Sequence, residues 1–137
     1  MTDISRHTTA FQVEDRSWLY GLHGTDQTPP ATLDVSAFTQ ADHYPNGYIP
    51  SGIVLKEAIS GGKTVYVPTI GDGSDTAAGI LYGSLKIPDL LDLSINVSGA
   101  ILVHGFVKIS RLPIPAGTAG AFHASNLADL PMIHFAA

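Results

Sequence analysis

The residue spacings that could support chemistry begin with a glycine-rich turn, Gly61-Gly62-Lys63-Thr64, which matches the end of a phosphate-binding loop. The complete motif, G-x-x-x-x-G-K-[ST], needs another glycine five residues before the second one, and Glu57 occupies that position. The segment also leads into a β-branched run, whereas a phosphate-binding loop opens a helix. We therefore expect a hairpin turn here and no phosphate site.

A second glycine-rich stretch, Gly71-Asp72-Gly73-Ser74-Asp75, offers two carboxylates to a calcium ion. An EF-hand loop alternates its oxygen ligands and ends on a glutamate, and this stretch has neither feature. Asp89 and Asp92 form another carboxylate pair, but they flank a loop near Pro88, which is a weak setting for acid–base catalysis. The sequence also lacks the Gly-x-Ser-x-Gly nucleophile motif. We predict that the protein is not an enzyme.

The histidines are the remaining candidates for metal ligands. None of them forms a His-x-His or His-x3-His pair, so a metal site would need residues that the fold brings together from separate segments. The chain contains six: His7, His23, His43, His104, His123 and His134. We predict no metal site and no cofactor.

Length, cysteine content and charge exclude several classes of protein. At 137 residues the chain fits one domain, and without cysteine it can form no disulfide framework. Only 14% of its residues are charged, against roughly 25% in a typical domain, and its net charge is −5. This acidic balance, with no two adjacent basic residues, argues against nucleic-acid binding. The sparse charge indicates either a surface that other chains cover or a somewhat apolar monomer.

The sequence shows no membrane or targeting segment. Its longest apolar run, Ala100–Val103, is far shorter than the ~20 residues of a membrane-spanning helix. The N-terminus lacks the apolar stretch of a signal peptide. We expect no membrane partner, and a setting in the cytoplasm or in an assembly built there.

The first thirty residues differ in pattern from the rest. Residues 1–17 are polar and mixed, and Pro29-Pro30 favours the extended backbone of a hinge. We predict an extended N-terminal arm and hinge over residues 1–30, mobile when free, and a single β-rich body domain over residues 31–137. An apolar group in the arm is either a staple on the protein's own core or an anchor that becomes ordered on a partner. Its members are Phe11, Trp18, Leu19, Tyr20 and Leu22.

The body reads as a series of short strands separated by turns. The runs that predict strands are 53–55, 64–67, 77–82, 98–110 and 132–135, with the longest, 98–110, expected to be one continuous strand. Residues 116–130 are rich in alanine and predict one short helix that ends before Pro131. The pattern predicts a mostly β domain with minor α+β character, built as a small β-barrel or roll.

Five segments together carry a resemblance to a known family. They are Trp18-Leu19 through Gly24-Thr25-Asp26, His43 to Gly52, Ala78 to Tyr82, Ala100 to Gly105 with Val107, and the closing Leu127 to Phe135. In their order and spacing the chain resembles the head decoration (capsid cement) proteins of tailed phages, the lambda-type family of small shell-stabilising proteins.

The resemblance implies a β-tulip-like body with a short helix, which binds the expanded phage head as a homotrimer at local threefold positions. The N-terminal arm would dock on the major capsid protein, and the trimer would clamp neighbouring capsomers against the internal DNA pressure. Such a protein is made in the host cytoplasm and ends on the outer surface of the virion. Because each trimer has three arms, a detached arm would rebind at high effective concentration.

Two sets of residues are the predicted contacts. The capsid-binding arm set is Phe11, Val13, Trp18 and Leu19, and the trimer-interface set is Tyr44, Tyr48, Ile133 and Phe135. Two alternatives stay open at this point. One is a small ligand-binding or enzymatic β-barrel with a cavity lined by His104 and His134, and the other is a phage tail or baseplate structural protein.

Overall fold

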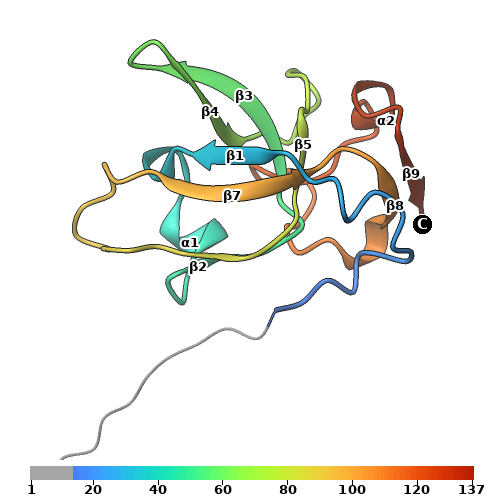
Figure 1. The fold of residues 1–137 in the computed structure, drawn as a ribbon, viewed down its shortest axis with the longest axis horizontal. Helices are drawn as coiled ribbons and strands as arrows, with labels where there is room; N and C mark the ends of the chain where they lie inside the picture. The colour runs from blue at the N-terminus through green and yellow to red at the C-terminus, as the bar shows by residue number, and fades with distance from the viewer. Residues whose placement is uncertain (1–13) are drawn as a thin grey trace, which may run out of the picture.

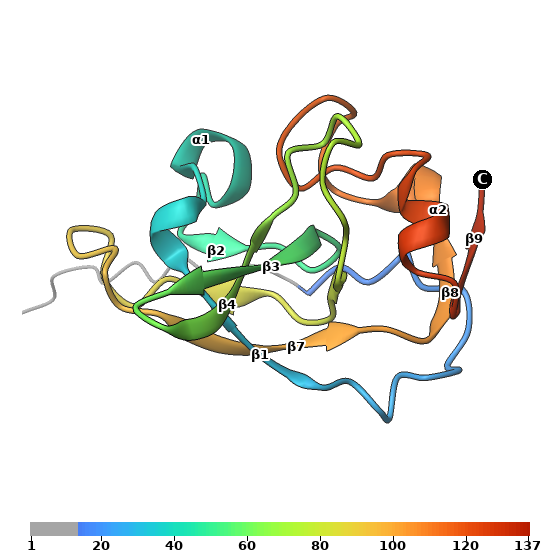
Figure 2. The same ribbon diagram turned by 90° about the horizontal axis from the view of Figure 1, so that it is seen from above.

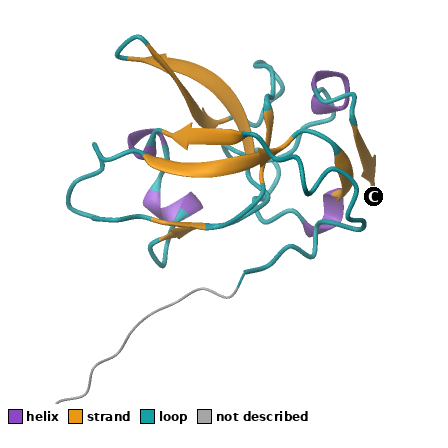
Figure 3. Cartoon of the chain, viewed as in Figure 1, coloured by secondary structure: helices purple, strands orange, loops and turns teal. Residues whose placement is uncertain are grey.

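A computed structural model describes residues 14–137 (Figure 1). The strands are β1 (Pro30–Leu33), β2 (Tyr48–Ile49), β3 (Val54–Ser60), β4 (Lys63–Pro68), β5 (Gly79–Leu81), β6 (Leu85–Lys86), β7 (Val97–Leu102), β8 (Gly105–Lys108) and β9 (Ile133–Ala136). The helices are α1 (Gln40–His43) and α2 (Asn126–Asp129), with 3-10 turns at Val35–Ala37 and Ile109–Arg111. Loops join these short elements along much of the chain (Figure 3). The predicted mostly β fold is confirmed.

Five strands close into a barrel in the order β1-β4-β3-β5-β7. Strand β1 closes it, because it pairs antiparallel with β7 on one side and parallel with β4 on the other, where Leu33 faces Tyr66. Two smaller sheets lie outside the barrel: β2 with β6, and β8 parallel to β9. Seen from above, β8, β9 and α2 lie together at one end of the molecule (Figure 2).

The hairpin between β3 and β4 confirms the turn predicted at Gly61-Gly62. Ser60 pairs directly with Lys63, so the turn has two residues, and both glycines have positive φ values of 58° and 79°. Two-residue turns with this backbone match the right-handed twist of the paired strands, and glycine adopts the conformation without a steric penalty.

The strand predicted over residues 98–110 is wrong as a single element. It divides into β7, which belongs to the barrel, and β8, which pairs with β9. Gly105, with a φ of 150°, begins β8 just after the break. Ile101 and Leu102 are both buried because they lie on opposite faces of β7, each packed in a different hydrophobic core. Local pattern could not reveal the break, since both halves are apolar and β-prone.

The helices agree in part with the prediction. Helix α2 lies inside the predicted interval 116–130 and ends two residues before Pro131. Helix α1 is an addition to the one helix predicted. It is a single turn of four residues, too short to show an apolar repeat in the sequence.

Neighbouring residues of the central strands point into two separate cores. Leu55 and Leu81 face the barrel interior, whereas Val54 and Ile80 pack toward β8 and β9. The register agrees with this division, because Val54 pairs with Ile80, and Ile80 with Leu102 of the second core. A strand buried on both faces carries a continuous apolar run. The short runs in β3, β5 and β7 are therefore explained by two cores that share these strands.

Candidate functional site

Trp18, predicted as an arm anchor, lies in the second core. Its side chain is 1% exposed, and its Nε1 donates a hydrogen bond to the Oγ of Ser51 at 3.2 Å. The Oγ of Ser51 donates in turn to the carbonyl oxygen of Asp15 at 2.8 Å. The N–H of Lys108 donates to the carbonyl of Trp18 at 2.6 Å, and Leu19 forms an antiparallel bridge with Val107. Residues 18–19 therefore extend the sheet of β8 and β9 and belong to the body.

The segment before Trp18 is also tied to the body. The side chain of Glu14 accepts hydrogen bonds from the N–H and the hydroxyl of Ser84. The Nε of Arg16 donates to the carbonyl of Tyr82 at 2.8 Å, and its guanidinium lies 4.2 Å above the Tyr82 ring. Arg16 also pairs with Glu14 at 3.2 Å. These contacts fix the chain from residue 14 onward, and we name residues 14–19 the root.

Phe11 and Val13, the other two predicted arm contacts, lie outside the described residues. Their roles stay a prediction. The Trp18 contacts agree with the staple alternative for that residue, in which the indole ring packs on the protein's own core.

The four predicted trimer contacts do not form one surface. Tyr44 and Ile133 are buried inside the protomer, Tyr44 in the barrel core and Ile133 in the second core. Tyr48 and Phe135 are half-buried, and the ring of Phe135 lies 4.9 Å from that of Phe122. Only the latter two side chains retain area that another copy could cover.

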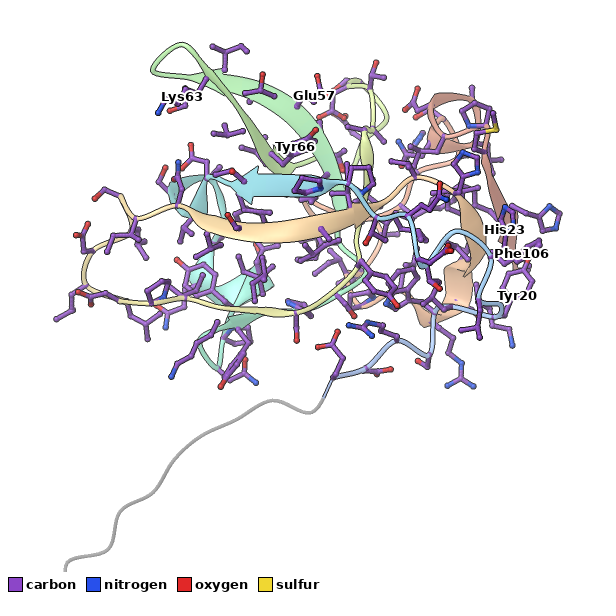
Figure 4. The ribbon with its side chains drawn as sticks, viewed as in Figure 1. Tyr20, His23, Glu57, Lys63, Tyr66 and Phe106 are labelled. Carbon is purple, nitrogen blue, oxygen red and sulfur yellow. The ribbon has the colours of Figure 1, made fainter. Side chains whose placement is uncertain are left out.

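The structure instead brings aromatic and imidazole rings together at the β8–β9 end of the molecule. Tyr20 lies 5.3 Å from Phe106, and Phe106 lies 5.7 Å from His23 and 6.0 Å from His134, all measured between ring centroids. His23 lies 6.0 Å from His104. Figure 4 shows Tyr20, His23 and Phe106 side by side. We name this surface the imidazole patch, made of Tyr20, Leu22, His23, His104, Phe106 and His134.

The backbone beneath the imidazole patch is closely packed. A Cβ at Gly21 would come within 2.7 Å of the Phe106 ring, and one at Gly24 within 2.3 Å of the His104 carbonyl oxygen. Only glycine permits the 20–24 segment to approach β8 so closely. Sequence reasoning missed the patch because its residues come from three distant segments.

A second exposed surface, with apolar and acidic side chains, lies at the other end of the molecule. The loop between β6 and β7 exposes Leu90, Leu91 and Ile95 and carries Asp89 and Asp92. We name these five residues the acidic knob. The sequence pattern did not predict this surface, because leucines such as Leu90 and Leu91 are usually core residues.

The described residues contain a cavity of about 580 Å³ beside β3. Its charged groups already have partners. Asp75 pairs with Lys56 at 3.0 Å and accepts from the N–H of Ile70, and Asp129 accepts from Ala77 and Asn126. The lining residues are Lys56, Glu57, Asp75, Thr76, Ala77, Ala78 and Asp129. These carboxylates hold loops in place, and the predicted cavity residues His104 and His134 do not line it.

Beside this cavity, the β3–β4 hairpin carries Glu57, Lys63 and Tyr66 (Figure 4). The Oη of Tyr66 donates to the Oε1 of Glu57 at 3.5 Å. Burial first, and then the Glu57 carboxylate, raise the pKa of the Tyr66 hydroxyl above its ordinary value. The phenol therefore stays protonated and acts as a hydrogen-bond donor.

Two histidines in the described chain have structural partners. The Nδ1 of the buried His43 accepts from the N–H of Thr39 at 2.8 Å, so its Nε2 carries the proton and donates to the carbonyl of Ala119 at 2.7 Å. The Nδ1 of His123 contacts Ser125. Between residues 14 and 137, no three His, Cys, Asp or Glu side chains are arranged to hold a metal ion.

The chain matches no protein-family model, no curated protein and no solved structure. Among residues 14–137, no helix has both the length and the apolar character needed to cross a membrane.

Proposed function

We propose that the chain is a capsid decoration protein of a tailed phage, which binds the expanded head as a homotrimer and stabilises the shell. The order of the five family-like segments in the sequence supports this proposal. The β-barrel body has few charges and two exposed apolar surfaces, which suits a protein that binds other protein surfaces.

The observation that carries the proposal is the fixed root at residues 14–19. Trp18 is held in the second core, and Glu14 and Arg16 are bound to Ser84 and Tyr82. Residues 1–13 therefore start from a defined position on the body. We assign to these residues, with Phe11 and Val13, the docking on the major capsid protein. A tethered arm with a fixed origin rebinds at high effective concentration, so three modest contacts per trimer suffice to hold it.

Trp18 and Leu19 have a different role in this proposal. They hold the root and do not touch the capsid, because the indole ring is covered by the protein's own core. A deletion that tests the arm must therefore end before Glu14.

The test is co-sedimentation with expanded, DNA-free heads of the phage that encodes the chain. Full-length protein should bind saturably, and a variant that lacks residues 2–13 should lose most of this binding while keeping its melting temperature. The double variant Phe11→Ser/Val13→Ser should weaken binding in the same direction. A matched control, Thr8→Ser/Gln12→Ser, changes the same segment without removing apolar area and should bind normally.

The outcomes separate the possible roles. Binding by both the full-length and the truncated protein would keep the decoration role and move the contact to the body. If neither binds, the decoration proposal fails. Trimer mass without shell binding would then favour a tail or baseplate protein, and a monomer without shell binding would favour a ligand-binding barrel.

A further inference from the structure

We propose that copies of the chain associate head to tail, with the acidic knob of one copy docked on the imidazole patch of the next. The inference rests on the self-association in the proposed function and names the two surfaces that would carry it. The partner on each surface is a second copy of this chain.

Hydrogen bonds within the acidic knob hold its leucines in exposed positions. Leu91 is 97% exposed, and its N–H donates to the Oδ1 of Asp89 at 2.9 Å. The Oδ1 of Asp92 accepts from both the N–H and the hydroxyl of Ser94. Both aspartates therefore stabilise the turns of the loop that displays Leu90 and Leu91. A loop ordered before binding loses less entropy when it docks.

The imidazole patch has the complementary chemistry. Tyr20 and Phe106 supply apolar ring area, and Leu22, two residues after Tyr20 in the sequence, is 85% exposed. His23, His104 and His134 are exposed and supply N–H donors. None of the six residues of the patch is acidic; the exposed Lys108 lies two residues from Phe106 on the same face of β8, and the exposed Asp26 lies three residues after His23 in the sequence. Apolar area and carboxylate acceptors on one surface thus match apolar area and N–H donors on the other.

The positions of the two surfaces exclude a contact between them within one molecule. The loop that forms the knob lies at one end of the long axis, and β8 and β9 lie at the other end, in both views (Figures 1 and 2). One molecule cannot bring its own two ends together. Seven of the nine large apolar side chains that the described chain exposes lie at these ends: Leu90, Leu91 and Ile95 at one, and Tyr20, Leu22, Leu127 and Met132 at the other.

A contact between two different surfaces has a defined consequence for assembly. Each copy uses its knob once and its patch once, so the contact is heterologous. If the rotation between neighbours closes after three copies, the product is the trimer of the proposed function. If the rotation does not close, the same contact produces an open chain of copies.

Cysteine cross-linking tests the contact directly, because the natural chain contains no cysteine. The double variant Leu22→Cys/Leu91→Cys places one thiol on each surface, at positions whose exposure makes folding tolerant of the change. Under mild oxidation it should form covalent oligomers that a reductant reverses. The matched control Leu22→Cys/Ile59→Cys uses another strongly exposed position, 73% against 97% for Leu91, on the β3–β4 hairpin and should stay uncoupled. Cross-linking of the control alone, or of neither variant, would overturn the inference.

A second measurement removes the apolar contact. Leu91→Asp should lower the association constant of the free protein roughly ten- to a hundred-fold, as expected for losing one buried leucine side chain. Ile59→Asp should leave association unchanged. Analytical ultracentrifugation reports both, and circular dichroism confirms that each variant folds. A monomer at every concentration of the wild type, or equal association by both variants, would contradict the inference.

These results are independent of the shell. If cross-linking fails but the arm deletion abolishes head binding, the proposed function stands and the knob-to-patch contact does not. If cross-linking succeeds but no variant binds heads, the association surface stands and the decoration function fails.

Discussion

The indole Nε1 of Trp18 and the Oγ of Ser51 lie 3.2 Å apart inside the second core, in a hydrogen bond between residues 33 positions apart. The same hydroxyl donates to the carbonyl of Asp15, so one serine joins the root to the body twice. Trp18, which the sequence analysis assigned to the arm, therefore has a structural role in the core. The two hydrogen bonds also explain why residues 14–19 hold a defined position on the barrel.

Replacing Trp18 with alanine should therefore lower the free energy of unfolding by about 3–5 kcal/mol, as for other large core aromatics. Urea denaturation followed by circular dichroism measures the change. Leu22→Ala is the control, because Leu22 lies in the adjacent segment but is exposed, and its effect should stay within about 0.5 kcal/mol. Unchanged stability with reduced head binding would instead make Trp18 a capsid contact.

Comparing alanine substitutions at two glycines measures how much the close backbone packing beneath the imidazole patch contributes to stability. Gly24 and Gly47 have φ values of 78° and 86°, but a Cβ at Gly24 meets the carbonyl of His104, whereas one at Gly47 meets nothing within 4 Å. Gly47→Ala should cost about 1–2 kcal/mol from the backbone conformation alone. Gly24→Ala should cost about 1–3 kcal/mol more, because the clash adds overpacking.

The emission of Trp18, the one tryptophan of the chain, gives a second readout for these glycine variants. It should shift to longer wavelength in Gly24→Ala, as the 18–24 segment moves away from β8, and stay unchanged in Gly47→Ala. Equal losses of stability in both variants would show that the packing on His104 adjusts without cost.

His43 should prove structural. Replacement by leucine removes the hydrogen bonds of the imidazole to the N–H of Thr39 and the carbonyl of Ala119. Because Thr39 is exposed and Ala119 half-buried, the expected loss is about 1–3 kcal/mol for the two together. His104→Leu, at an exposed position, is the control and should change the unfolding free energy by less than about 0.5 kcal/mol. Thermal and urea unfolding measure both variants. A stable His43→Leu protein would mean that water or a shifted loop replaces both hydrogen bonds.

Acid should weaken the acidic-knob loop. The hydroxyl of Ser94, and then its N–H, lower the pKa of Asp92 below the ordinary 3.8. A depressed carboxyl pKa contributes stability that is complete above pH 3.8 and is lost as the pH falls through the lower folded value. Hydrogen bonds from Ser17 and Ser74 lower the pKa values of Asp15 and Asp72 in the same way, so these turns add to the loss.

The measurement is the unfolding free energy between pH 7 and pH 2. Asp92→Asn keeps an acceptor oxygen but removes the titration, so its stability should fall less steeply below pH 4 than that of the wild type. Ser94→Ala should also flatten the curve, because it removes the largest cause of the shift. Parallel curves for all three proteins would contradict this account.

Limited proteolysis tests the division between arm and body. If residues 1–13 form the arm, a nonspecific protease should trim free protein up to the root and spare the chain after Arg16. Mass spectrometry of the product locates the last cut. Resistance of the whole chain, or cuts throughout residues 20–30, would contradict a boundary at the root.

Local chemistry in the sequence determined the mostly β class, the hairpin at Gly61-Gly62 and the helix ahead of Pro131. These features depend on backbone preferences and turn residues that lie within a few positions of one another. The low fraction of charged residues likewise indicated apolar area on the surface, though not its location.

Tertiary structure alone decided the rest. The burial of Trp18 depends on Ser51 and Lys108, the division of residues 98–110 depends on two different partner strands, and the imidazole patch joins rings from positions 20, 106 and 134. Such contacts follow from which strands pair across the barrel, and no local pattern encodes a partner tens of residues away. Leu91 is the reverse case, a residue that looks buried from the sequence but is exposed in the structure. Its sequence context is that of a core leucine, and only the path of the loop leaves it exposed.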